Sequence, residues 1–395
     1  MLSLVKTLKT LQERTPLGLL QLKHDRMRLL TAIAGITFAD ILIFMQLGFA
    51  DALYKTNTQY PRNLQADLVL ISTQAENFRK SRTFARRRLY QALDVPGVAS
   101  ADALYVGSIE WRNPQTREKA SMSIVGQNPD RPAFDLPEIN QQLDAIRLPD
   151  TVLFDRASRG EYQDAIARVE RGEAVATEIG LRTVTIAGLF EVGASFADDG
   201  AIITSDQNFL RLFPKRDAGT VNLGLISLEP GYDPEQVRAR LAARLPDDVQ
   251  VLTDEGYLEF ELADIQSNSP IGFVFGLGTA MGLIVGTVIV YQVLSTDVNS
   301  HLAEYATFKA MGYRNRYLLG VVFEEALILS LLGFLPGLVV ALGAYQLTAT
   351  ATALPIAMPV SRAIYVFLLT LVMCGASGAI ATRRLQAADP ADIFS

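Results

Sequence analysis

The chain has 395 residues, of which 49% are hydrophobic and 20% charged, and its formal net charge at pH 7 is −6. This charge disfavours a nucleic-acid-binding role, because binding a phosphate backbone needs an excess of Lys and Arg. The single cysteine, Cys374, excludes an intrachain disulfide. Charged residues are frequent between residues 50 and 270, whereas the last third of the chain contains long uncharged stretches. We therefore expect a membrane protein that carries one large polar domain.

Four segments are apolar over a length that crosses a bilayer. A hydrocarbon core about 30 Å thick requires about 20 apolar residues in a helix. The segments are residues 29–49, 271–294, 317–347 and 363–382. The first contains one charged residue, Asp40, and the third has Glu324 and Glu325 near its start. The sequence thus predicts four transmembrane helices, and we expect the two glutamates to lie at the membrane edge, where at least one reaches water, without a special role.

Basic residues in the short flanks predict the orientation, because Lys and Arg resist translocation. They are Lys6, Lys9, Arg14, Lys23, Arg26 and Arg28 before the first span, Lys309, Arg314 and Arg316 between the second and third, and Arg383 and Arg384 after the fourth. We therefore expect residues 1–28, 295–316 and 383–395 in the cytoplasm. Residues 50–270 and the short loop 348–362 would then be periplasmic, in a multi-pass protein of the inner membrane.

The segment 50–270 has the pattern of an α+β domain inserted between the first two spans. Strands are expected at 67–72, 221–228 and 249–253, and helices at 83–93 and around Val237, Leu241 and Leu245. These elements form two strand-helix-strand units, one near each end of the segment. We expect them to build a membrane-proximal lobe, and residues 122–220 to form a more irregular distal lobe.

The inserted domain lacks the residues that common catalytic sites use. It contains no His and no Cys, which excludes Ser-His-Asp and Cys-His sites and the usual zinc ligands. Asp198 and Asp199 are interpreted as a solvated turn in preference to an acid–base pair. The run Arg86 to Arg88 is interpreted as the exposed side of a helix, with contact to anionic lipid or an acidic partner as the alternative. We therefore expect no catalytic residue, metal site or bound cofactor in this chain.

Small and charged residues within the spans suggest how the helices pack. Five glycines of the second span, which share one side of the helix, allow another helix to approach closely. They are Gly272, Gly276, Gly278, Gly282 and Gly286. They line either a contact within the chain or a homodimer interface. Asp40 either makes a polar contact that fixes helix packing or lines a substrate or proton route.

The loop between the second and third spans resembles a known cytoplasmic signature. Residues 304–313 predict a short helix closed by Gly312. Glu304 to Gly312 is similar to the pattern Glu-x-x-x-x-(Lys/Arg)-Ala-(Met/Leu)-Gly of the FtsX/MacB superfamily, the mechanotransmission (type VII) ABC transporters. Arg383 to Phe394 resembles the superfamily's C-terminal pattern, and Gly35 to Phe49 resembles its DevC branch, known from cyanobacterial exporters.

The resemblance implies roles that composition does not provide. In this superfamily the loop helix docks on an ATPase subunit, permeases pair as homodimers, and the periplasmic domain meets a membrane-fusion adaptor that leads to a TolC-like outer-membrane channel. The resemblance places the coupling role on Glu304, Tyr305, Thr307, Phe308, Lys309, Met311, Gly312 and Tyr313. The sequence has no Gly-x-x-x-x-Gly-Lys-Ser/Thr motif, so ATP and Mg²⁺ would be bound by a separate ATPase chain.

The cargo is a less direct expectation. The DevC branch implies export of a glycolipid. One alternative is a lipoprotein-release permease of the same superfamily. A second is an FtsX-like regulatory protein that relays ATPase motion to a periplasmic enzyme and transports nothing.

Overall fold

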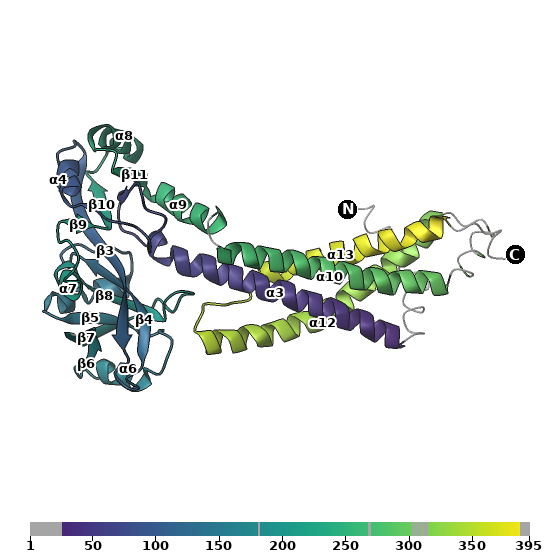
Figure 1. Cartoon of the computed structure of the whole chain (residues 1–395). Coiled ribbons are helices and arrows are strands. Elements are labelled where there is room, and N and C mark those ends of the chain that lie inside the picture. Colours follow the sequence, from purple (N-terminus) through teal and green to yellow (C-terminus); the bar gives the residue numbers. More distant parts are fainter. Residues whose placement is uncertain are drawn as a thin grey trace. The chain divides into compact units, whose positions relative to one another are not determined.

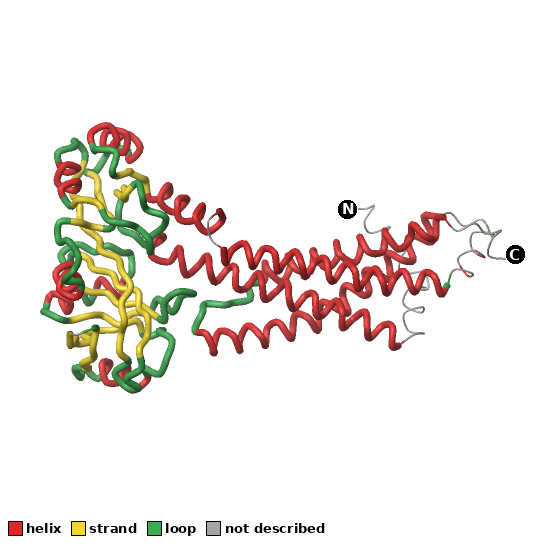
Figure 2. Tube along the Cα trace, in the orientation of Figure 1, coloured by secondary structure: helices red, strands yellow, loops and turns green. Residues whose placement is uncertain are grey.

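The computed structural model describes residues 26–180, 182–267, 270–301, 304, 307, 311 and 315–387. The chain divides into two compact units, each described by itself below (Figure 1). The helical unit comprises Met1–Ala50, Phe273–Leu347 and Ala357–Ser395, and the sheet unit comprises Asp51–Gly272 and Thr348–Ile356. Figure 2 shows that the strands belong to the sheet unit and that long helices make up the described part of the helical unit.

Four long helices contain the predicted spans. They are α3 (Arg26–Arg62), α10 (Pro270–Ser300), α12 (Asn315–Thr352) and α13 (Val360–Ala387). Each is long and apolar enough to cross a membrane, so the prediction of four apolar helices is confirmed. The helices extend beyond the predicted spans because polar residues also continue a helix in water. After residue 49, for example, Lys55 pairs with Asp51 at 3.0 Å, one turn earlier in α3.

The helical unit has a narrow buried seam and a broad apolar exterior. Small and aliphatic residues such as Ala32, Ala39 and Val290 are fully buried where α3, α10 and α13 meet. Large apolar side chains such as Phe273 and Val339 remain exposed. An exposed apolar exterior of this extent is typical of helices that face lipid.

The sheet unit contains a nine-stranded mixed sheet in the order β11-β1-β10-β3-β4-β8-β5-β7-β6. Its strands are β1 (Leu68–Ser72), β3 (Val98–Arg112), β4 (Lys119–Gln127), β5 (Thr151–Asp155), β6 (Val175–Ile179), β7 (Arg182–Phe190), β8 (Gly200–Ser205), β10 (Leu223–Leu228) and β11 (Val249–Thr253). A second sheet pairs β2 (Phe84–Ala85) with β9 (Thr220–Val221). The shorter helices are α4 (Arg87–Leu93), α5 (Pro137–Asn140), α6 (Gln163–Glu170), α7 (Asp206–Leu212), α8 (Pro234–Arg244) and α9 (Asp254–Ser267), with a 3₁₀ helix, η1 (Leu143–Arg147).

The long strand β3 belongs to two parts of this sheet. Its first half pairs with β10, and its second half, from Tyr105, pairs with β4. Beyond β4 the sheet curls until Trp111 of β3 meets Ile179 of β6, which closes the second part into a ring. The prediction of irregular structure between residues 122 and 220 is therefore wrong. Those residues form strands whose partners lie far away in the sequence, a feature that local patterns do not reveal.

Both faces of the sheet are covered near β1. Leu68 and Leu70 point to a core that includes Leu89 of α4 and Leu241 of α8. Val69 and Ile71 point to the opposite core, which contains Tyr60 of α3 and Tyr257 of α9. Because side chains alternate along a strand, a strand that is buried on both faces is continuously apolar, as β1 is.

One predicted helix is shorter than expected. The segment 83–93 begins with β2, in which Phe84 pairs with Val221, and only then enters α4. The prediction of a single helix over 83–93 is wrong because the distant partner β9 holds its first residues in a strand.

Candidate functional site

Three helices of the helical unit meet in a buried ionic cluster, made of Arg28, Asp297, His301 and Glu325. Nη1 of Arg28 in α3 donates to Oδ1 of Asp297 in α10 at 3.0 Å, and its Nη2 donates to the Ser300 hydroxyl at 3.3 Å. His301 Nδ1 lies 3.5 Å from Oδ2 of Asp297. The Glu325 carboxyl of α12 is fully buried and faces Asp297. The cluster thus joins α3, α10 and α12 where the chain leaves α10.

Burial makes this cluster sensitive to the spacing of the helices. Each buried ion has lost hydration worth several kcal/mol, which only close partners offset. A shift of α10 relative to α3 would separate Arg28 from Asp297 and leave the two carboxyls without that guanidinium. Of the two glutamates at the start of the third span, Glu325 is fully buried in this cluster, whereas Glu324 is half-buried. The sequence signal that could have indicated this cluster was a charged residue just after an uncharged span, namely Asp297.

The predicted coupling residues directly follow the cluster. Glu304, Thr307 and Met311 are described and exposed, and the Met311 N–H donates to the Thr307 carbonyl at 3.0 Å. The other five, Tyr305, Phe308, Lys309, Gly312 and Tyr313, lie outside the described residues. The role assigned to this loop stays a prediction.

Three of the five predicted packing glycines contact other helices of the same chain. A Cβ added to Gly278 would meet Gln46, one added to Gly282 would lie 3.0 Å from Ile43, and one added to Gly286 would lie 2.8 Å from the Ala39 Cβ. Gly276 faces open space, and Gly272 belongs to the sheet unit. The intrachain alternative therefore accounts for Gly278, Gly282 and Gly286.

Asp40 makes a polar contact between two helices. It is fully buried in α3, and the Thr370 hydroxyl of α13 donates to its Oδ1 at 2.7 Å. Gly337 of α12 packs against its Cβ. The geometry therefore favours the packing alternative for this residue.

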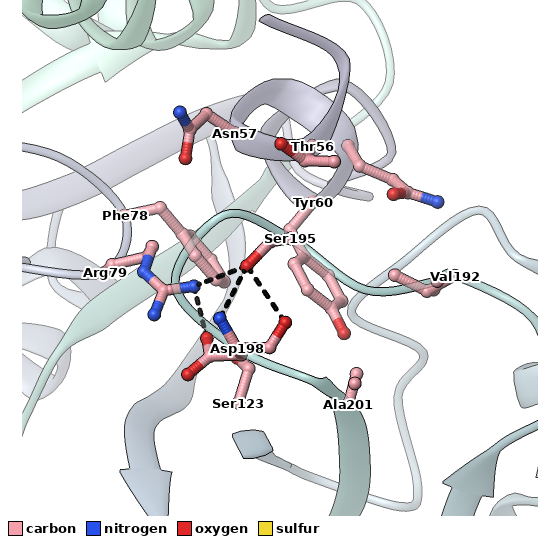
Figure 3. Close-up of a pocket in the computed structure, with 13 residues that line it drawn as sticks. Thr56, Asn57, Tyr60, Phe78, Arg79, Ser123, Val192, Ser195, Asp198 and Ala201 are labelled. Atoms are coloured by element: carbon pink, nitrogen blue, oxygen red, sulfur yellow. Dashed lines mark hydrogen bonds and ion pairs between the residues drawn. The ribbon is translucent and has the colours of Figure 1, made fainter. Parts of the chain in front are cut away.

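The sheet unit contains a small cavity beside Asp198 (Figure 3). Its walls include Thr56 and Tyr60 of α3, Arg79 and Ser195. Arg79 forms an ion pair with Asp198, whose side chain is 3% exposed. The prediction of a solvated turn is therefore wrong for Asp198, because a distant arginine pairs with it. Asp199 is more exposed and pairs with Arg159 at 2.9 Å.

The basic run on α4 is also divided. Arg88 is buried, and its Nε and Nη2 donate to the Asp248 carboxylate at 3.0 Å. Arg87 is exposed, and Arg86 lies half-buried near the Tyr105 hydroxyl. The interpretation as an exposed helix side is therefore wrong for Arg88, which fastens α4 to the residue just before β11.

Comparison with known proteins identifies the C-terminal part of the chain. Residues 276–390 match the family model described as the FtsX-like permease C-terminal domain. This stretch contains most of α10, the predicted coupling loop, α12 and α13. A comparison with curated proteins finds no match.

Three solved structures resemble part of the chain. The periplasmic region of MacB from Actinobacillus actinomycetemcomitans is 7% identical, with a TM-score of 0.34, and the match covers 54% of this chain and 97% of that one. The extracellular domain of the ABC-type transporter YknZ from Gram-positive bacteria is 15% identical (TM-score 0.31; 47% and 99% covered). A domain of a putative permease from Porphyromonas gingivalis is 14% identical (TM-score 0.31; 47% and 88% covered).

Proposed function

We propose that this chain, whose residues 276–390 match the FtsX-like permease C-terminal domain, is an ABC-type permease of the FtsX/MacB superfamily and the transmembrane subunit of an exporter driven by a separate ATPase. In this proposal the loop 301–314 receives the motion of the ATPase and passes it into α10 and α12. The sheet unit, on the periplasmic side, then acts with an adaptor and an outer-membrane channel. By resemblance to the DevC branch, the cargo is a lipid or glycolipid.

The family match over residues 276–390 carries the proposal. Two structural features support it. Four helices are long and apolar enough to span a membrane, and the ionic cluster joins three of them at the start of the proposed coupling loop. A rigid joint at this place would make a push on the loop move several helices together.

The test uses the purified chain in complex with its ATPase partner. Lys309→Glu and Gly312→Pro should each lower the ATPase rate of the complex at least tenfold relative to the unmodified complex, because the first reverses a contact charge and the second breaks the end of the loop helix. Lys215→Glu makes the same charge change in the sheet unit and should leave the rate unchanged. If the ATPase rates with Lys309→Glu and Gly312→Pro equalled the rate with the control Lys215→Glu, the loop would have no coupling role.

Copurification separates the proposed exporter from its alternatives. An adaptor and an outer-membrane channel recovered with the chain would support export. A cell-wall hydrolase bound to the sheet unit would instead indicate a regulatory protein, and a bound lipoprotein would indicate a lipoprotein-release permease.

A further inference from the structure

The loop between β7 and β8, residues 191–199, is held by a dense polar network. The buried Asp198 carboxylate pairs with Arg79 and accepts hydrogen bonds on Oδ1 from the hydroxyls of Ser108 and Ser121 at 3.3 and 3.2 Å. Within the loop, the Asp198 N–H donates to Oγ of Ser195 at 2.9 Å (Figure 3). The loop is therefore fixed to β3 and β4 through two serines and to the β1–β2 loop through one arginine.

The first segment at this loop is the end of α3, a helix that begins in the helical unit. Thr56 and Tyr60 line the small cavity together with Arg79, Ser195 and Asp198 (Figure 3). The Tyr60 ring also stacks on Phe78, the neighbour of Arg79, with ring centroids 5.3 Å apart. The last turns of α3 thus pack directly against the residues that hold the loop.

The second segment is α9, which precedes α10 in the chain. The β1–β2 loop binds it through two contacts. The Asn77 amide donates to Oδ2 of Asp264 at 2.8 Å, and the Phe78 N–H donates to the buried Glu261. Arg79, next in the chain, makes the ion pair with Asp198. Three consecutive residues therefore connect α9 to the β7–β8 loop.

The third segment is 348–356, which leads from α12 toward α13. The guanidinium of Arg159 holds it. Nε of Arg159 donates to the Thr352 carbonyl at 2.7 Å, Nη1 pairs with Asp199 at 2.9 Å, and Nη2 donates to the Ser195 carbonyl at 3.3 Å. One side chain thus joins the end of α12 to the same loop.

We propose that the β7–β8 loop is a joint that ties all three segments leading to the membrane helices to the central sheet, through the ion pairs Arg79–Asp198 and Arg159–Asp199. Arg79 and Arg159 are positioning residues: they decide whether displacement of α3, α9 or the 348–356 segment reaches the sheet. This role rests on the proposed function. The local tie between Arg159 and Thr352 can be measured without it.

Hydrogen–deuterium exchange of the purified full chain tests the tie. Arg159→Gln should make amides of residues 348–356 exchange about fivefold faster, since a charge-assisted hydrogen bond and an ion pair are lost. Arg79→Gln should likewise make the amides of residues 73–83 exchange about fivefold faster. Arg211→Gln is the matched control, because Arg211 is a similarly exposed arginine that pairs with Asp150, outside the β7–β8 loop and both tested segments. It should change neither segment, and unchanged exchange in 348–356 for Arg159→Gln would overturn the joint.

A second hydrogen–deuterium exchange experiment compares the complex of the chain and its ATPase partner with and without ATP. In the unmodified complex, ATP should change exchange in β3 and β4, and Arg159→Gln should reduce that change by at least half. A full response in Arg159→Gln despite faster exchange in 348–356 would overturn the joint and leave the proposed function standing. No ATP response in the unmodified complex would overturn both.

Discussion

The Arg28 guanidinium lies 3.0 Å from the carboxylate of Asp297, a residue 269 positions further along the chain. Because Arg28 is 22% and Asp297 4% exposed at the side chain, the pair is mostly removed from water. The pair joins the first and second long helices next to Glu325 of the third. It therefore fixes the spacing of these helices at the end of α10, where the proposed coupling loop begins.

Arg28→Ala should destabilise the helical unit. The substitution leaves Asp297 and Glu325 facing each other without the guanidinium, at a cost somewhat below the roughly 3–5 kcal/mol seen when a fully buried pair loses one partner. Arg26→Ala removes the same charge from an exposed position and should have little effect. Thermal unfolding of the purified chain in detergent measures both. Equal midpoints for Arg28→Ala and Arg26→Ala would show that the ion pair does not hold the helices.

Two glycines of α10 should respond in opposite directions to the same substitution. Gly286→Ala places a methyl 2.8 Å from the Ala39 Cβ, so α10 and α3 must separate and stability falls. Gly276→Ala meets nothing within 4 Å and should be neutral or stabilising by up to about 1 kcal/mol, the difference in helix propensity. The order of the two unfolding midpoints is the measurement. A destabilising Gly276→Ala would instead place a second copy of the chain, or another partner, on that face.

Asp40 should be replaceable by a neutral residue of the same shape. Asp40→Asn keeps an oxygen that accepts from Thr370, so the partner's ATPase rate and the unfolding midpoint should stay near those of the original chain. Asp40→Leu loses that acceptor and should lower the midpoint, by an amount on the order of 1 kcal/mol for one interhelical hydrogen bond. If Asp40→Asn abolished transport while the chain stayed folded, a proton or substrate route would replace the packing role.

The sequence predicts the parts of this fold that depend on neighbouring residues. A predominantly apolar length of about 20 residues is sufficient to predict each long helix, and apolar runs predict β1, β10 and β11. Contacts between distant residues are not predicted. The closure of the sheet at Trp111 and Ile179, the burial of Asp198 by Arg79, and the pairing of Arg88 with Asp248 each join residues that no local pattern relates.

The same limit applies to the candidate site. The loop signature predicts which residues contact the ATPase. It does not predict the ionic cluster beside the loop, because Arg28, Asp297 and Glu325 come from three different helices. Each residue alone resembles an ordinary charge at the end of a span. Only their proximity in the fold identifies a joint.

Stability of the sheet unit should fall as the pH rises toward 8. Burial raises the pKa of Glu261 to about 8, well above its ordinary value of 4.5. Below pH 4.5 the carboxyl is protonated in both the folded and the unfolded chain. Between pH 4.5 and 8 only the folded chain keeps the proton, so the free energy of unfolding decreases with pH, by roughly 4 kcal/mol over the whole window.

Glu261→Gln should remove this part of the pH dependence. The amide keeps the shape of the protonated carboxyl without its titration. The unfolding midpoint of each purified protein, measured between pH 5 and 8.5, provides the comparison. Parallel curves for the original chain and Glu261→Gln would mean that Glu261 does not titrate in this window.

The most direct test of the central claim is which side of the membrane each unit faces. Single cysteines at Thr307, in the proposed coupling loop, and at Asp144, whose side chain is 93% exposed in the sheet unit, are placed in a Cys374→Ala chain. Intact cells with a permeabilised outer membrane are then treated with a membrane-impermeant maleimide. We predict labelling of the cysteine at 144 in intact cells and of the cysteine at 307 only after lysis. Labelling of the cysteine at 307 in intact cells would contradict the account.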